Sequence, residues 1–164
     1  MAGPGIKLAG LSDREGCIDA VLRFVQSIDD ADKSMTNSAF TEDCFFDLSA
    51  VMAGDASIGT FTTRKAFVDE LMENVGVLDT LHQATNFRVE VGDNDTAKLT
   101  CMVLAQHHRV GEGAKADKIG LIMGNRFNIE LKRGDGPPGF WQISKLTIRC
   151  AWSQGDMSAF VSAR

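Results

Sequence analysis

Two adjacent histidines, His107 and His108, close a stretch whose residues alternate as in a β-strand, Thr96 to Val110. One face of this strand is apolar until its last member, and comprises Leu99, Cys101, Val103, Ala105 and His107. A strand that ends its buried face with an imidazole places a group titrating near neutral pH at the rim of a core or cavity. Two interpretations stay open for His107: an acid–base group, or a structural histidine with satisfied hydrogen bonds.

The third histidine, His82, lies just before another strand, predicted from Thr85 to Val91. The sequence GDND that follows is a strong turn signal, so the two strands should form a hairpin. Antiparallel pairing about that turn brings His82 opposite the stretch from Ala105 to His107. The face that His82 takes is left open: a five-residue turn directs it away from His107, whereas a one-residue slip or a bulge reverses this.

A carboxylate, Asp29, directly follows the apolar stripe of the first predicted helix. The helix begins at the capping box Ser12-Asp13-Arg14-Glu15, and its stripe comprises Ile18, Val21, Leu22, Val25 and Ile28. Asp29 could therefore point inward or be solvated. We expect the neighbouring acids Asp30 and Asp32 to be solvated or to cap the next helix.

An amide, Asn125, interrupts the apolar face of a further strand predicted at 121–131. A buried amide must find hydrogen-bond partners, so Asn125 is either a structural hydrogen-bonding residue or a group that recognises a ligand. The last predicted strand, 140–152, carries Leu146, Ile148, Cys150 and Trp152 on one face.

The elements that position these residues follow one another in a simple order. Helices are predicted at 12–29, 33–40 and 62–75, with a short strand at 42–49 and a loop at 50–61. Long strands then follow, separated by turns and by loops at 111–118 and 134–139. This order predicts an α+β domain with its helices gathered on one side of a strongly bent antiparallel sheet.

Composition limits the classes of function. A chain of 164 residues suffices for one domain with a sizeable core. Its net charge of −5 argues against nucleic-acid and anionic-membrane partners, and no apolar run approaches a membrane span. The four cysteines show no metal-binding spacing and suit a reducing compartment. With no signal peptide visible, we expect the protein to be cytoplasmic.

Together the motifs resemble the SnoaL-like group of the nuclear transport factor 2-like superfamily, and within it scytalone dehydratase. The resemblance is carried by SIDDADK, TLHQATNFRVEVGDNDTAKLT, LAQHHRV, GNRFNIELKR and GFWQISKLTIRCAW. It covers residues 12–155 and leaves 1–11 as a loose arm and 156–164 as a short tail. The fold that it implies is a cone-shaped α+β barrel, in which the curved sheet wraps around N-terminal helices.

The resemblance also implies roles for individual residues. Asp29, His82 and His107 match the aspartate and two histidines that line the pocket of scytalone dehydratase, and Asn125 lies near its polar strand residues. A histidine paired with an aspartate, such as His107 held by Asp29, could remove a proton beside a carbonyl and protonate a departing hydroxyl. Ile28 stands where that family has a tyrosine, and the chain contains no tyrosine. Scytalone itself is therefore not the expected substrate.

We accordingly predict a cofactor-independent dehydratase, isomerase or cyclase acting on a small apolar or aromatic secondary metabolite. The pocket is expected to be lined by Phe46, Met102, Met123, Phe127, Leu146 and Trp152, around Asn125. No catalytic metal is expected, because His107 and His108 face opposite ways on a strand. The alternative is a non-catalytic ligand-binding or dimerisation module. By analogy with the fold we expect a homodimer or homotrimer.

Overall fold

The computed structural model describes residues 8–51 and 59–158, which form three helices and six strands. Their order is α1 (Asp13–Asp29), α2 (Lys33–Ala39), β1 (Phe40–Ala50), β2 (Thr60–Phe61), α3 (Arg64–Asn74), β3 (Asp79–Val91), β4 (Thr96–His108), β5 (Leu121–Arg133) and β6 (Trp141–Gly155). Most of the arm predicted at 1–11, of the loop at 50–61 and of the tail at 156–164 lies outside the described residues.

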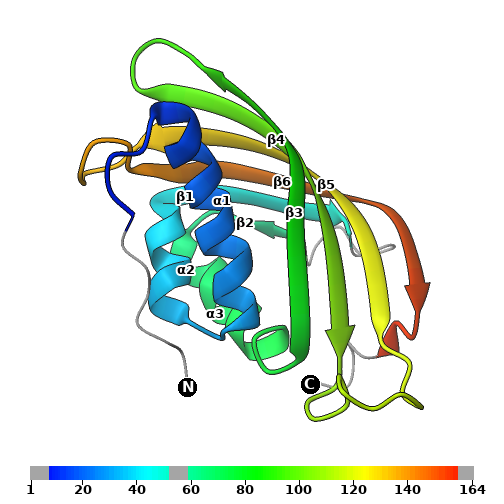
Figure 1. Ribbon diagram of the computed structural model, residues 1–164. Coiled ribbons are helices and arrows are strands. Elements are labelled where there is room, and N and C mark those ends of the chain that lie inside the picture. The colour runs from blue at the N-terminus through cyan, green and yellow to red at the C-terminus, as the bar shows by residue number, and fades with distance from the viewer. Residues whose placement is uncertain (1–7, 52–58, 159–164) are drawn as a thin grey trace.

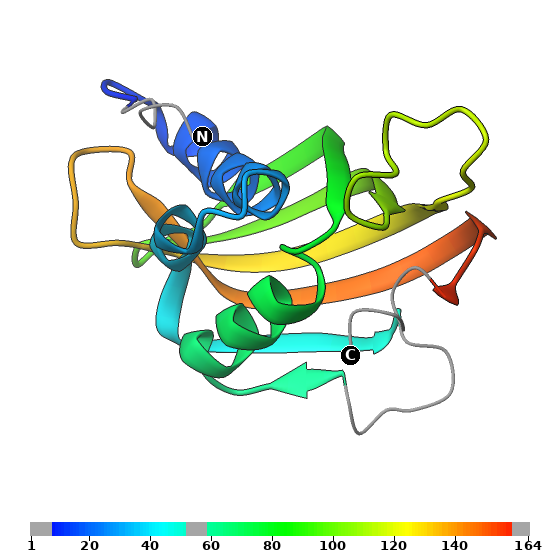
Figure 2. The same cartoon turned by 90° about the horizontal axis from the view of Figure 1, so that it is seen from below.

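The strands form one curved, unclosed sheet in the order β2-β1-β6-β5-β4-β3. The three helices lie on its concave side (Figures 1 and 2). This architecture confirms the predicted cone-shaped α+β fold. The sheet is mixed and not wholly antiparallel, however, because β1 runs parallel to β6. β1 comes from the start of the chain, so no hairpin ties its direction to that of β6.

The helix ends follow the local sequence. Ser12 forms both halves of the predicted capping box with Glu15 at the start of α1. The side chain of Asp32 accepts a hydrogen bond from the backbone of Met35 and caps α2. Thr63 caps α3 in the same way. None of the described helices is both long enough and apolar enough to span a membrane.

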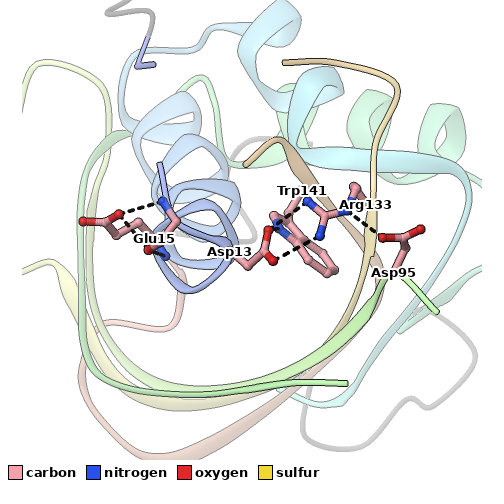
Figure 3. A network of polar contacts seen from close by, with 6 residues as sticks. Asp13, Glu15, Asp95, Arg133 and Trp141 are labelled. Atoms are coloured by element: carbon pink, nitrogen blue, oxygen red, sulfur yellow. Dashed lines mark hydrogen bonds and ion pairs between the residues drawn. The ribbon is translucent and has the colours of Figure 1, made fainter. Parts of the chain in front are cut away.

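A network of polar contacts fixes the first turn of α1 to the sheet (Figure 3). Arg133, at the end of β5, donates to both carboxylate oxygens of Asp13, at 2.8 and 3.1 Å, and to Asp95 at 2.7 Å. The indole nitrogen of Trp141 donates to Asp13 at 3.2 Å. α1 has 17 residues, about 25 Å of helix, so this network lies at the opposite end of α1 from Asp29.

Two of the register shifts in the sheet affect which side chains near the site face the helices. In β3, Thr85 pairs with Met102 but Arg88 pairs with Thr100, so one extra residue lies between them. Asn86 occupies this bulge with a φ of 57°, a left-handed conformation that asparagine tolerates better than most residues. In β6, Cys150 pairs with Asn125 but Trp152 pairs with Gly124, so Ala151 is the extra residue.

The outer face of the sheet carries exposed apolar side chains. Leu81 is 49%, Met102 46% and Trp152 51% exposed. Apolar side chains on an exposed sheet face suit association with another surface. The expected homodimer or homotrimer stays a prediction.

Candidate active site

The carboxylate of Asp29 points inward, and His82 is its main partner. The ring nitrogen Nδ1 of His82 lies 2.6 Å from Oδ1 of Asp29, and the His82 backbone N–H donates to Oδ2 at 2.8 Å. The hydroxyl of Thr80 also donates to Oδ1 at 2.8 Å. The end of α1 and the start of β3 therefore form a histidine–carboxylate pair that is largely shielded from solvent, with side-chain exposures of 8% for His82 and 15% for Asp29.

These contacts assign the tautomer of the His82 ring. Burial on its own raises the pKa of the Asp29 carboxyl, but the hydrogen bonds and charge of His82 and the Thr80 hydroxyl together hold that pKa below its ordinary value of 3.8. Asp29 is therefore ionised at neutral pH, and a carboxylate can only accept hydrogen bonds. Nδ1 of the neutral His82 must then carry the proton, which leaves the lone pair on Nε2.

The bulge at Asn86 is what turns His82 inward. On the N-terminal side of the bulge, His82 pairs with Ala105 and Thr80 pairs with His107. These four side chains therefore share the buried face of the hairpin. Of the two orientations left open for His82, the structure has the one that needs a bulge. Without the extra residue the imidazole would lie on the outer face, away from Asp29.

His107 occupies the predicted buried position but is not held by Asp29. Its side chain is 3% exposed, and its ring lies edge-to-face against that of His82, with 5.2 Å between ring centroids. Burial, assisted by the charge that His82 can carry, lowers the pKa of His107 to about 3, although a hydrogen bond with the Leu121 backbone acts in the opposite direction. His107 is thus neutral at physiological pH. The expected pairing of Asp29 with His107 was wrong, because β3 lies between them.

The buried faces of the sheet and the helices enclose a pocket of about 320 Å³. His82, His107 and Asn125 lie in its wall, and the rest of the lining is mainly apolar: Phe24, Ile28, Leu48, Val51, Phe61, Phe67, Leu71, Val75, Ala105, Met123, Phe127 and Ile148, with Glu70 and Asn74 from α3. Asn125 is 8% exposed, and its Oδ1 is buried without a hydrogen-bond partner among the described residues. The pocket therefore places a histidine–aspartate pair and an amide in apolar surroundings.

Three of the seven predicted lining residues, Met123, Asn125 and Phe127, do line the pocket. Phe46 does not, because it stacks behind Phe67 with 3.7 Å between ring centroids and forms a second layer. Leu146 is fully buried in the core, where it pairs with Phe46 and Ile129.

Met102 and Trp152 do not line the pocket either, because both lie on the outer face of the sheet. The bulge at Ala151 reverses the alternation of β6, so Trp152 lies over Gly124 and not beside Ile148. For Met102 the strand alternation already indicated the outer face.

Three polar residues near the site were not predicted from the sequence: Thr80, Glu70 and Asn74. Thr80 could have been found only from the bulged register of β3. Glu70 and Asn74 follow Phe67 at helical spacing, and that spacing was the available signal.

Stability should depend on pH through His107. Between its ordinary pKa of 6.5 and its folded pKa of about 3, the unfolded chain binds a proton at His107 that the folded chain does not. The contribution of His107 to the free energy of unfolding is fully present above pH 6.5. Between pH 6.5 and about 3 it decreases by up to about 1.4 kcal/mol for each pH unit. Urea unfolding at several pH values should show a smaller slope in His107→Gln than in the wild type. His108→Gln, on the opposite face, should keep the slope; equal slopes in the wild type and His107→Gln would contradict the prediction.

A chelator should leave any activity unchanged. Over the ranges 8–51 and 59–158, no group of three or more His, Cys, Asp or Glu side chains is arranged to hold a metal ion. Activity after EDTA treatment, compared with untreated protein and with protein supplied with Zn²⁺, checks this. A loss of activity that added metal restores would show the expectation to be wrong.

Comparison with solved structures places this fold among known ones. A proposed aromatic ring hydroxylase from Novosphingobium aromaticivorans has a TM-score of 0.72 and 22% identity, covering 93% of this chain and 96% of that one. A proposed scytalone dehydratase from the same organism has a TM-score of 0.68 and 16% identity, covering 87% and 86%. Their names state different reactions, and likeness at these identities shows the fold alone.

Sequence comparison gives the family. Terrestric acid biosynthesis cluster protein E of Penicillium crustosum is 34% identical over 164 residues, 98% of this chain and 99% of that protein. The sequence pattern of the SnoaL-like domain matches residues 9–147. Both matches run through α1 and β3 to β5, the elements that carry Asp29, His82, His107 and Asn125. The chain therefore belongs to the SnoaL-like domain family, as its motifs predicted.

Proposed function

We propose that this chain is a cofactor-independent acid–base enzyme, a lyase or isomerase, that removes a proton next to a carbonyl of an apolar secondary metabolite. The observation that carries the proposal is the contact of 2.6 Å between His82 Nδ1 and Asp29 Oδ1 beside a mainly apolar pocket. An adaptor of the same fold has no need of this pairing or of an open cavity. The match to a protein named for a biosynthesis cluster supports the secondary-metabolite assignment.

The first step uses the lone pair on Nε2 of His82. It removes a proton from the carbon beside the carbonyl, and the electrons of that C–H bond form the enolate. Asp29 stabilises the imidazolium that results, because its carboxylate already holds Nδ1–H. The amide of Asn125 can donate a hydrogen bond to the oxygen on which negative charge develops.

The second step decides between the reaction types. In a dehydration, the enolate electrons form a carbon–carbon double bond as a hydroxyl on the next carbon leaves. The proton on His82 Nε2 passes to that hydroxyl, so water departs and the neutral imidazole is restored. In an isomerisation, the same proton returns to a different carbon. Both routes use one base that becomes the acid, which suits a pair largely shielded from solvent beside a mainly apolar pocket.

His107 has a supporting role in this scheme. With a pKa of about 3 it carries no charge when His82 accepts the proton, so the two imidazoles do not repel one another. A charged neighbour at this distance would oppose formation of the His82 imidazolium. His107 therefore acts as a neutral wall of the pocket beside the base.

The proposal can be tested before the substrate is known. 2-Tetralone is a bicyclic apolar ketone whose protons beside the carbonyl exchange slowly with D₂O, and proton NMR measures that exchange. The protein should accelerate it beyond an equal concentration of free imidazole, since the pocket adds orientation to basicity. Binding of 2-naphthol in the same pocket should suppress the acceleration. Exchange no faster than with imidazole would contradict the proposal.

A further inference from the structure

Helix α3 contributes both polar and apolar side chains to the wall of the pocket. Phe67, Glu70, Leu71 and Asn74 all line the cavity. Their spacing of three and four residues puts them on one helical face. α3 faces the concave side of the sheet (Figure 2), from which His82 and Asn125 line the same cavity. The pocket thus has polar groups on two different walls.

Both polar groups of α3 offer hydrogen-bond acceptors. Nδ2 of Asn74 donates to the backbone carbonyl of Glu70 at 2.9 Å. A carbonyl can only accept, so this contact assigns the amide nitrogen and leaves Oδ1 of Asn74 as an acceptor. The carboxylate of Glu70 is also an acceptor group. The α3 wall therefore suits a ligand that donates hydrogen bonds.

The Glu70 carboxylate has no ion-pair partner in the part of the chain that the structure describes. Its neighbour Asp69 differs: it binds Lys33 at 2.6 Å and also contacts Lys65 on the outside of the helix. The other wall carries the buried Oδ1 of Asn125, which also has no partner among the described residues. The pocket therefore offers hydrogen-bonding groups on both walls, which suits a ligand that is polar at two places.

We propose that Glu70 and Asn74 select substrates that carry a hydroxyl or an amine where they meet α3, and exclude substrates with a carboxylate there. The inference rests on the proposed function and narrows its substrate class. The substrate would be an apolar compound with a carbonyl beside His82 and a neutral or cationic hydrogen-bond donor at its other end. A carboxylate at that end would meet the like charge of Glu70 in the pocket wall.

Calorimetric titration with three naphthalene probes tests this selection. 2-Naphthol has one hydroxyl, 2,6-dihydroxynaphthalene has a second at the opposite end, and 6-hydroxy-2-naphthoate has a carboxylate there. The wild type should bind the dihydroxy compound about tenfold more tightly than 2-naphthol, as a hydrogen bond to a charged group allows. It should bind the naphthoate most weakly.

Three variants of α3 assign the effect to Glu70. Glu70→Leu should lose the preference for the second hydroxyl, and Glu70→Gln should bind the naphthoate about tenfold more tightly than the wild type does. Glu73→Gln is the matched control, because Glu73 is exposed on the same helix and lies outside the pocket lining. It should leave all three affinities unchanged. Equal affinities for the two naphthols in the wild type, or an unchanged ratio in Glu70→Leu, would overturn the inference.

The His82→Asn variant separates this inference from the proposed function. It should keep the probe preferences of the wild type while losing proton exchange on 2-tetralone. If exchange survives in His82→Asn but the preferences depend on Glu70, the catalytic scheme is wrong and the ligand selection stands. If exchange is lost but the preferences do not depend on Glu70, the scheme stands and the selection is wrong.

Discussion

Replacing His82 by Asn should lower the rate of proton exchange on 2-tetralone by roughly 10² to 10⁴-fold, the range that a general base contributes. Asparagine keeps an N–H close to the position of Nδ1, so the hydrogen bond to Asp29 can persist while the Nε2 lone pair is lost. The measurement is the exchange rate per folded molecule, together with the melting temperature. The melting temperature should change little.

The control for this prediction is His108→Asn. His108 follows His107 on β4 but belongs to the opposite face of the strand. Its replacement should leave exchange near the wild-type rate. If His82→Asn exchanges the ketone as fast as the wild type does, the base is not His82 and the proposed scheme fails.

Asp29→Asn should produce a loss of similar size by a different route. An amide nitrogen beside Nδ1 can donate to the ring, which moves the ring proton to Nε2 and removes the base. The neutral amide also cannot stabilise the imidazolium as the carboxylate of Asp29 does. The exchange rate should fall by roughly 10² to 10⁴-fold. The change also weakens hydrogen bonds from Thr80 and the His82 backbone, so a stability loss of about 1 to 3 kcal/mol is expected.

The double variant, His82→Asn with Asp29→Asn, shows whether the two residues act as one unit. Its exchange rate should be no lower than that of the poorer single variant, because either change already disables the pair. Multiplying losses would indicate that Asp29 and His82 contribute separately. Such a result would leave the pair as a structural contact that is not a catalytic dyad.

The features that the sequence predicted correctly are those decided within a few residues. The Ser12–Glu15 capping box, the cap at Asp32 and the alternation that buries His107 each depend on neighbours along the chain. Local spacing therefore sufficed for the helices and for the buried face of β4. The resemblance to SnoaL-like proteins supplied the three residues Asp29, His82 and His107 as a set.

The pairing within that set could not be predicted, because it depends on single-residue bulges. One extra residue at Asn86 turns His82 toward Asp29. Another at Ala151 moves Trp152 to the outer face. A bulge reverses the faces of the side chains on one side of it relative to those on the other, and the sequence does not mark where it occurs. Glu70 and Asn74 were not predicted, because the apolar stripe of α3 identifies its buried face but does not show which polar residues beside it reach the pocket.

The network at Asp13 has a consequence for how this chain can tolerate insertions and deletions. α1 is fixed to Arg133 and Trp141 at its first turn and carries Asp29 at its last residue. One residue inserted between these ends would turn Asp29 by about 100° and move it about 1.5 Å along the axis. The carboxylate would then face away from His82 although no pocket residue had changed. The spacing from Asp13 to Asp29 should therefore allow substitutions but not changes in length.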